Sequence, residues 1–185
     1  NNDDTMSFNL KLDNTGGNGG DNPSPGESLF YESFNDCDGT GGNDDLWSGT
    51  VAQGTFSPDN GGWSSSSRFG ADRCAKFGSS KNLGEVTTPS FTVNGTATFT
   101  FRAAPWASDG TLLTLSVSSG ATISPSSFTM KSNQWTDFTA TITGTGNVKV
   151  TFTPTKRFFL DEVKASAPSQ TGIKGITTNP SDKRA

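Results

Sequence analysis

The 185-residue sequence contains no histidine, and this absence excludes several kinds of catalytic and metal site. Without an imidazole there is no Ser-His-Asp triad, no Cys-His nucleophile pair and no histidine-ligated zinc. Only two cysteines are present, Cys37 and Cys74, and they lie too far apart for a CxxC redox or zinc motif. Two interpretations stay open: two unpaired buried thiols, or a disulfide, which an acidic chain rich in Gly, Ser and Thr favours.

The chain also lacks a long apolar run and an excess of positive charge. No stretch approaches the roughly 20 apolar residues that cross a bilayer, and no signal peptide stands at the start. The net charge of -4 argues against nucleic acid or an anionic membrane as a partner. Because residue 1 stands in the middle of polar sequence, we expect a piece excised from a longer protein.

Methionine is scarce, whereas 14 Phe and four Trp are available to fill a core. Abundant Thr and Ser favour strands and turns over helices, and no window shows a helical period. Residues 28–166 show about eight to ten short alternating runs separated by turn signals. They predict an all-β domain, a two-sheet antiparallel β-sandwich of the jelly-roll type, with disordered or extended termini.

Alternation assigns the faces of the clearest strands. Asn94-Gly95 predicts a two-residue hairpin inside the segment 84–104. After this turn, Thr98, Thr100 and Arg102 lie opposite the inward residues. The expected inward sets are Phe99, Phe101 and Ala103; Leu113, Leu115 and Val117; Phe138, Ala140 and Ile142; and Val148, Val150 and Phe152.

The two ends of the chain differ in composition from the strand-rich part. Residues 1–27 hold one short alternating run, interpreted as the last strand of an upstream domain, and then a Gly/Asn/Pro linker. Residues 167–185 contain Pro, Gly and Ser without periodicity, which indicates a tail or a linker.

Two carboxylates interrupt apolar faces of the expected first and last strands. In "SLFYESFNDC", Glu32 shares a face with Phe30 and Phe34, and in "RFFLDEVKAS" Asp161 shares one with Phe159 and Val163. An unpaired buried carboxylate is costly, so each needs a cation, a metal or a shifted pKa.

The candidate partners of these carboxylates leave two alternatives open. Calcium takes six to eight oxygen ligands, and Asn43 with Asp44 or Asp45 could complete a site that pins the terminal strands. Alternatively, Glu32 pairs with Arg73 or Lys76, and Asp161 caps a turn.

Three segments carry a resemblance to a known family: "FYESFNDCDGTGGNDDLWSG", "FGADRCAKFGSSKNLGEVTTPSF" and "RFFLDEVKAS". Together they resemble a jelly-roll accessory domain of secreted multidomain proteins of Bacteroidota, similar in architecture to calcium-containing carbohydrate-binding modules. The resemblance covers about residues 28–166, and it departs from the family pattern at Glu162, where a second Asp is usual. It implies a structural calcium ion held by Glu32, Asn43, Asp44 and Asp161, and a disulfide between Cys37 and Cys74.

A sugar-binding surface needs aromatic rings for stacking and polar groups for the hydroxyls. The aromatic candidates are Trp47, Trp63, Trp106, Trp135 and Tyr31. Trp63 with Arg68 and Trp106 with Asp109 come first, because they stand in Gly- or Ser-rich segments.

Catalysis is not expected, because glycosidase carboxylates flank an open cleft and these two lie between phenylalanines. The resemblance thus implies a non-catalytic, monomeric module that binds a polysaccharide or oligosaccharide and belongs to a bacterial secreted or cell-surface enzyme. The alternative is a non-binding spacer that stabilises a secreted peptidase or glycosidase.

Overall fold

The computed structural model describes residues 24–118 and 120–168 of the chain. The expected upstream strand, most of the linker and the C-terminal tail lie outside the described residues. No helix in the described part is long and apolar enough to cross a membrane. Eleven strands are present: β1 (Ser28–Glu32), β2 (Arg68–Gly70), β3 (Ala75–Phe77), β4 (Val86–Thr87), β5 (Phe91–Pro105), β6 (Leu112–Val117), β7 (Thr122–Ser124), β8 (Ser127–Thr129), β9 (Thr136–Val148), β10 (Val150–Pro154) and β11 (Phe158–Ser166).

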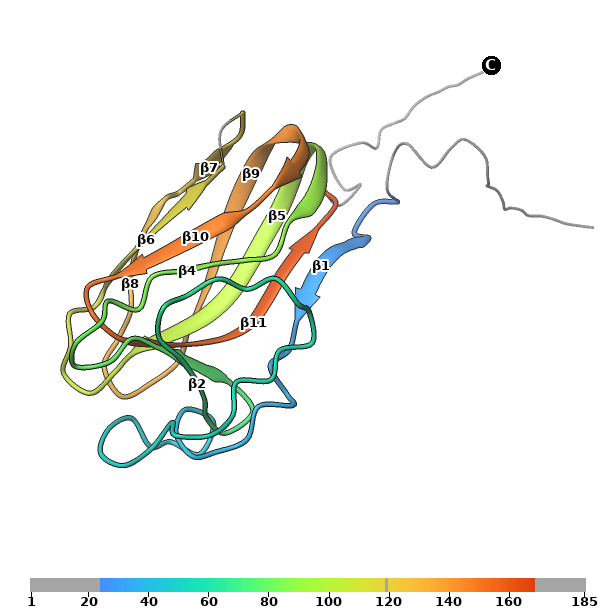
Figure 1. Ribbon diagram of the computed structural model, residues 1–185. Coiled ribbons are helices and arrows are strands. Elements are labelled where there is room, and N and C mark those ends of the chain that lie inside the picture. The colour runs from blue at the N-terminus through green and yellow to red at the C-terminus, as the bar shows by residue number, and fades with distance from the viewer. Residues whose placement is uncertain (1–23, 119, 169–185) are drawn as a thin grey trace, which may run out of the picture. The chain divides into compact units, whose positions relative to one another are not determined.

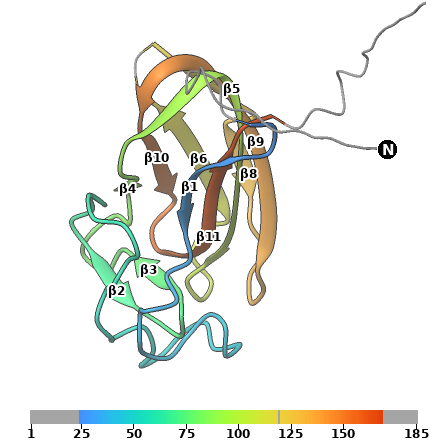
Figure 2. The ribbon, with the colours of Figure 1, turned by 90° about the vertical axis from the view of Figure 1, so that its right-hand side faces the viewer.

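The strands form two antiparallel sheets that face each other (Figures 1 and 2). The odd-numbered strands together with β2 make a seven-stranded sheet in the order β2-β3-β11-β5-β9-β7, and β1 also pairs with β11. The remaining even-numbered strands make a four-stranded sheet in the order β4-β10-β6-β8. The expected all-β, two-sheet sandwich is therefore confirmed.

The main core fills the space between the two sheets and is dominated by phenylalanine. Phe101 is nearly fully buried, and its ring centre lies 5.1 Å from that of Phe152 on the facing sheet. Most of the residues expected to point inward are buried, and Val117 and Phe138 are half-buried against the same core. Alternation therefore predicted the inward faces of β5, β6, β9 and β10 correctly.

The hairpin expected at Asn94-Gly95 is wrong, because both residues lie inside the continuous strand β5. Asn94 pairs with Thr145 and Gly95 with Gly144 of β9, in an unbroken register. Gly95 has a φ of 94°, which glycine adopts without strain, so the local turn signal fits within the strand. The long pairing with β9 has overridden it.

A second hydrophobic cluster lies on the outer face of the seven-stranded sheet. Here Phe159 of β11 is covered by Trp47, with 5.4 Å between the ring centres. Trp47, Val51 and Ala52 of this cluster belong to the long connection between β1 and β2, which Figures 1 and 2 show gathered at one end of the sandwich, beside β2 and β3. One end of the outer face is therefore closed by this connection.

Candidate functional site

Glu32 lies at the end of β1 on the inner face of its sheet and is fully buried. Its Oε1 accepts hydrogen bonds from the backbone and side-chain nitrogens of Asn60, both at 3.0 Å, and from Trp63 Nε1 at 3.0 Å. Its Oε2 accepts the backbone N–H of Phe34 at 3.0 Å and of Asp59 at 2.7 Å. Five N–H donors therefore satisfy the carboxylate, and neither Arg73 nor Lys76 takes part.

Asp161 lies on the opposite, outer face and is paired with a cation. Arg102 of β5, its cross-strand neighbour, contacts Asp161 Oδ2 at 3.0 Å. Asn43 donates to the same oxygen at 3.2 Å and accepts from the Arg102 guanidinium through its own Oδ1. Burial raises the pKa of Asp161 to about 6, and the hydrogen bonds from Arg102 and Asn43 oppose this rise.

A bulge in β11 separates the two carboxylates. Asp161 pairs with Arg102, but Lys164 pairs with Thr100, so β11 carries one extra residue in this interval. The extra residue is Glu162, whose φ is 52°. The bulge exchanges the faces: Val163 enters the inner core while Asp161 points outward. The expectation that Asp161 and Val163 share a face is therefore wrong.

The residues proposed as calcium ligands do not form one site in this structure. Asp44 accepts the backbone N–H groups of Gly41 and Leu46 and so orders its own turn, while Asn43 contacts Asp161 alone among the predicted carboxylates. Among the described residues no group of three or more acidic, Cys or His side chains is placed to hold a metal. With every Glu32 oxygen already bonded to N–H groups, the donor set fits a satisfied carboxylate and not an ion.

The disulfide predicted between Cys37 and Cys74 is absent, and both residues are buried free thiols. Cys37 packs in the cluster between the sheets, whereas Cys74 packs in the cluster on the outer face. Side chains that point into different clusters do not meet the geometry of a bridge. Burial raises the pKa of Cys37 to about 11 and also raises that of Cys74, so neither thiol is activated.

The first predicted ligand pair, Trp63 and Arg68, does not form a binding surface. Trp63 is buried among Phe30, Phe34 and Phe77, and its indole N–H is used by Glu32. Arg68 is exposed and donates to the backbone carbonyl of Ser65 in its own turn. The expectation that Trp63 stands clear of the sheets is wrong, because its ring is part of the core.

The second predicted pair, Trp106 and Asp109, lies in a cationic cluster at the covered end of the outer face. Trp106 is half-buried and stacks on Phe159, with 5.8 Å between the ring centres. Asp109 accepts two hydrogen bonds from Arg157, at 2.7 and 3.0 Å, which hold the pKa of Asp109 below its ordinary value. Lys76 places its ammonium 4.5 Å from the centre of the Trp106 ring. Sequence reasoning had placed Lys76 elsewhere, as a partner of Glu32.

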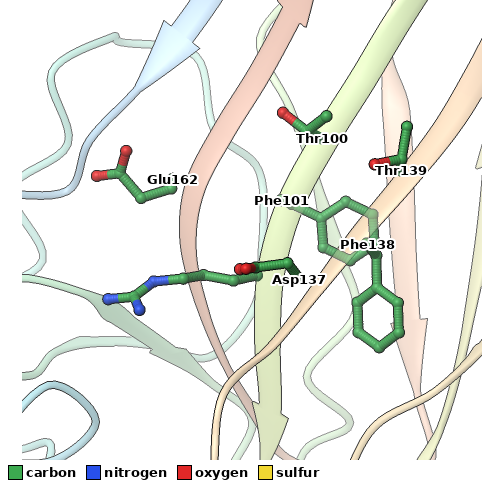
Figure 3. A pocket seen from close by; sticks show the side chains of 7 residues that line it. Thr100, Phe101, Asp137, Phe138, Thr139 and Glu162 are labelled. Carbon is green, nitrogen blue, oxygen red and sulfur yellow. The ribbon is translucent and has the colours of Figure 1, made fainter.

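A shallow depression of about 230 Å³ lies near the middle of the outer face (Figure 3). Figure 3 shows Glu162 and Asp137 on opposite sides of it, with Thr100 and Thr139 along one edge. Its lining combines carboxylates, a guanidinium and hydroxyls, and comprises Thr100, Phe101, Arg102, Asp137, Phe138, Thr139 and Glu162.

Tyr31 connects an aromatic ring to this depression. It is 43% exposed, and it donates its hydroxyl to Glu162 Oε1 at 2.7 Å. This hydrogen bond is the main reason why the pKa of Tyr31 is raised to about 12. Tyr31 is the most exposed aromatic side chain of the described residues, because the four tryptophans are buried or half-buried.

Sequence analysis identified Tyr31 as an aromatic candidate but did not associate it with Glu162 or Arg102. One signal was available, since alternation had already placed Thr100 and Arg102 on the outward face of their strand. The missing information was which strands are neighbours, because β11 lies between β1 and β5.

Neither a scan against protein-family models nor a search of curated proteins finds a match. Among solved structures, the chain is similar to the isomalto-dextranase of Arthrobacter globiformis T6 complexed with panose, at 17% identity and a TM-score of 0.36, over 56% of this chain and 20% of that one. It is also similar to a carbohydrate-binding module CBM36 in complex with calcium and xylotriose, at 15% identity and a TM-score of 0.40, over 75% of this chain and 100% of that one. A third match is the C-terminal CBM6 of a marine laminarinase from Zobellia galactanivorans, at 14% identity and a TM-score of 0.34, over 50% and 87%. These are similarities of fold alone.

Proposed function

We propose that residues 28–168 form a non-catalytic carbohydrate-binding module of a secreted multidomain protein. The polysaccharide binds on the outer face of the seven-stranded sheet, at the depression beside Tyr31. The observation that carries this proposal is the juxtaposition of an exposed aromatic ring with a concave, polar-lined surface. Stacking on a ring and hydrogen bonds to hydroxyl groups are the two interactions that sugars need.

The lining supplies both donors and acceptors. Asp137 and Glu162 accept hydrogen bonds, Arg102 donates them, and the Thr100 and Thr139 hydroxyls do either. The volume of about 230 Å³ is below the roughly 300–1,000 Å³ of sites that enclose a drug-sized ligand, and it suits one ring of a longer chain.

Charge favours a neutral glycan at this depression. The Arg102 guanidinium is already paired with Asp161 and lies 4.4 Å from the centre of the Trp135 ring. Asp137 is exposed and makes no ion pair within the described residues, and Glu162 is bound only by the Tyr31 hydroxyl. Two uncompensated carboxylates would repel a uronate or sulfate group.

The depression on the outer face fits the binding of a sugar better than its hydrolysis. A glycosidase must hold the sugars on both sides of the scissile bond between two carboxylates. A depression of this size on the face of a sheet cannot enclose such a substrate. Calcium, expected from the family resemblance, remains a prediction that receives no support from the placement of its proposed ligands.

The proposal is tested by affinity electrophoresis of the domain in gels that contain xylan, mannan, laminarin or dextran. We expect retardation on at least one of these neutral polysaccharides, with little dependence on salt, because screening affects charge pairs and scarcely affects stacking. Tyr31→Ala should weaken binding about tenfold, the equivalent of about 1.4 kcal/mol. Tyr31→Phe, which keeps the ring, should retain most of the affinity.

The matched control is Leu112→Ala on the four-stranded sheet, since Leu112 is 53% exposed and far from the depression in the sheet order. This variant should bind as the wild type does. If no glycan retards the wild-type domain, the alternative reading as a non-binding spacer replaces the proposal. If Leu112→Ala and Tyr31→Ala weaken binding equally, the site does not lie on the outer face.

A further inference from the structure

Lys76 of β3 is buried without an anionic partner. The residue is 7% exposed, and no carboxylate of the described residues forms an ion pair with it. Its ammonium lies instead over two aromatic rings, 4.7 Å from the centre of Phe69 and 4.5 Å from that of Trp106. Attraction to ring faces replaces only part of the hydration that a charged amine loses on burial.

The groups around Lys76 add positive charge. Arg157 lies 5.5 Å from the centre of the same Trp106 ring. Burial, and after it the charge of Arg157, lower the pKa of Lys76 to about 8. The nearby carboxylate is Asp109, and both its oxygens are taken by Arg157. Lys156 also acts electrostatically on Asp109. Three cations therefore share one carboxylate, in a protein whose net charge is -4.

The residues around the Lys76 ammonium are partly exposed to solvent. Trp106, Arg157 and Asp109 are each half-buried. A small anion that entered there would meet the Lys76 ammonium next to low-dielectric aromatic walls, where attraction between charges is stronger than in water.

We propose that Lys76, Arg157 and Trp106 form a binding site for a single anionic group, a carboxylate or a sulfate, of the kind that acidic sugars carry. The site is separate from the depression beside Tyr31, and it does not depend on the function proposed for that depression. The anion supplies the negative charge that Lys76 lacks among the described residues, and the neighbouring Arg157 adds a second hydrogen-bond donor.

Titration of the domain with sodium sulfate, sodium glucuronate and glucose, at constant ionic strength, tests the site by tryptophan fluorescence. We expect a saturable change with the two anions, because Trp106 lies against Lys76, and no change with glucose. Tighter binding of glucuronate than of sulfate identifies an acidic sugar as the source of the anion. Equal binding identifies a free oxyanion as sufficient. Both outcomes support the site.

Lys76→Met keeps the length of the apolar side chain and removes the charge, and it should weaken anion binding at least tenfold. The matched control is Lys149→Met, since Lys149 is an exposed lysine beyond the end of β9, and it should change nothing. If Lys76→Met does not fold, the wild type still decides the question by NMR of its labelled lysine side chains. Bound sulfate must then raise the pKa of Lys76. An unchanged pKa, or equal anion binding by Lys76→Met and the wild type, overturns the proposal.

Discussion

Glu32 and Asp161 are two buried carboxylates on paired strands, and the protein satisfies them in different ways. Glu32, on the inner face, receives five N–H donors and no cation. Asp161, on the outer face, receives Arg102, Asn43 and the backbone N–H of Glu162. The first arrangement ties β1 to the segment 59–63, and the second ties β11 to β5 and to the turn at Asn43.

The difference shows that a buried charge does not by itself indicate a metal. A carboxylate surrounded by N–H groups is stabilised by hydrogen bonding, and the donors of Phe34 and Trp63 would otherwise be unsatisfied buried groups. A carboxylate paired with one half-buried arginine keeps part of its desolvation cost, which is why the pKa of Asp161 remains raised. Removal of the two charges should therefore change the free energy of unfolding by different amounts and with a different dependence on pH.

The largest effect is expected from Glu32→Gln. The amide has the same size, but its NH₂ group faces N–H donors and cannot accept from them, so at least two donors lose their acceptor. We expect a loss of about 3–5 kcal/mol in the free energy of unfolding, as for a buried charge network that loses one member. Urea unfolding at pH 7, with comparison of midpoint and slope, measures it.

The matched control for this substitution is Glu85→Gln. Glu85 is exposed and accepts one hydrogen bond from Thr153, at 3.1 Å. We expect a change within about 0.5 kcal/mol. A loss below about 1 kcal/mol for Glu32→Gln would mean that the five donors find other acceptors, and that Glu32 does not hold the segment 59–63.

A smaller effect on the free energy of unfolding is expected from Asp161→Asn, and its direction depends on pH. The folded pKa of Asp161, about 6, lies above the ordinary value of about 3.9. The folded state therefore binds the proton more tightly, and this contribution to stability is full below pH 4 and lost as the pH rises through 6. Relative to Asp161→Asn, the wild type should lose on the order of 2 kcal/mol between pH 4 and pH 7.

Unfolding curves of both proteins, recorded at half-unit steps of pH, measure this difference. Asp72→Asn provides the control for the loss of a paired carboxylate, because Asp72 pairs with the exposed Arg73 and not with Arg102. If the wild type gains stability relative to Asp161→Asn as the pH rises through 6, then Arg102 outweighs burial and the pKa of Asp161 is lowered instead.

Sequence alternation predicted the sandwich and most of its core faces, because a period of two assigns the faces of any regular strand. It failed where a strand contains an extra residue. The bulge at Glu162 has a positive φ at a residue that carries no turn signal, so the face of Asp161 could not be read from the sequence. Asn94-Gly95 is the opposite case, because its turn signal predicted a hairpin and Gly95 lies within the strand β5.

The candidate sites were harder to predict than the fold. Glu32 was correctly expected to be buried, but its donors come from residues 59–63, in a connection without periodicity. Tyr31 and Glu162 are 131 positions apart in the sequence, and they meet only because β1 pairs with β11. Contacts of this kind depend on strand order and register, which a single sequence does not specify.

The smallest effect is expected from a metal chelator, and it tests whether Glu32 and Asp161 act separately. With Glu32 satisfied on the inner face and Asp161 paired on the outer face, neither carboxylate depends on an ion for a partner. We expect the melting temperature to be the same in EDTA and in excess calcium. A ligand that bound only the folded state would raise the melting temperature by mass action. At 100 times its Kd, such a ligand adds about 2.7 kcal/mol to the free energy of unfolding. If calcium does raise the melting temperature, Glu32→Gln and Asp161→Asn locate the ion. Loss of the calcium response in both variants would mean that the two carboxylates share an ion after all, as the family resemblance implies.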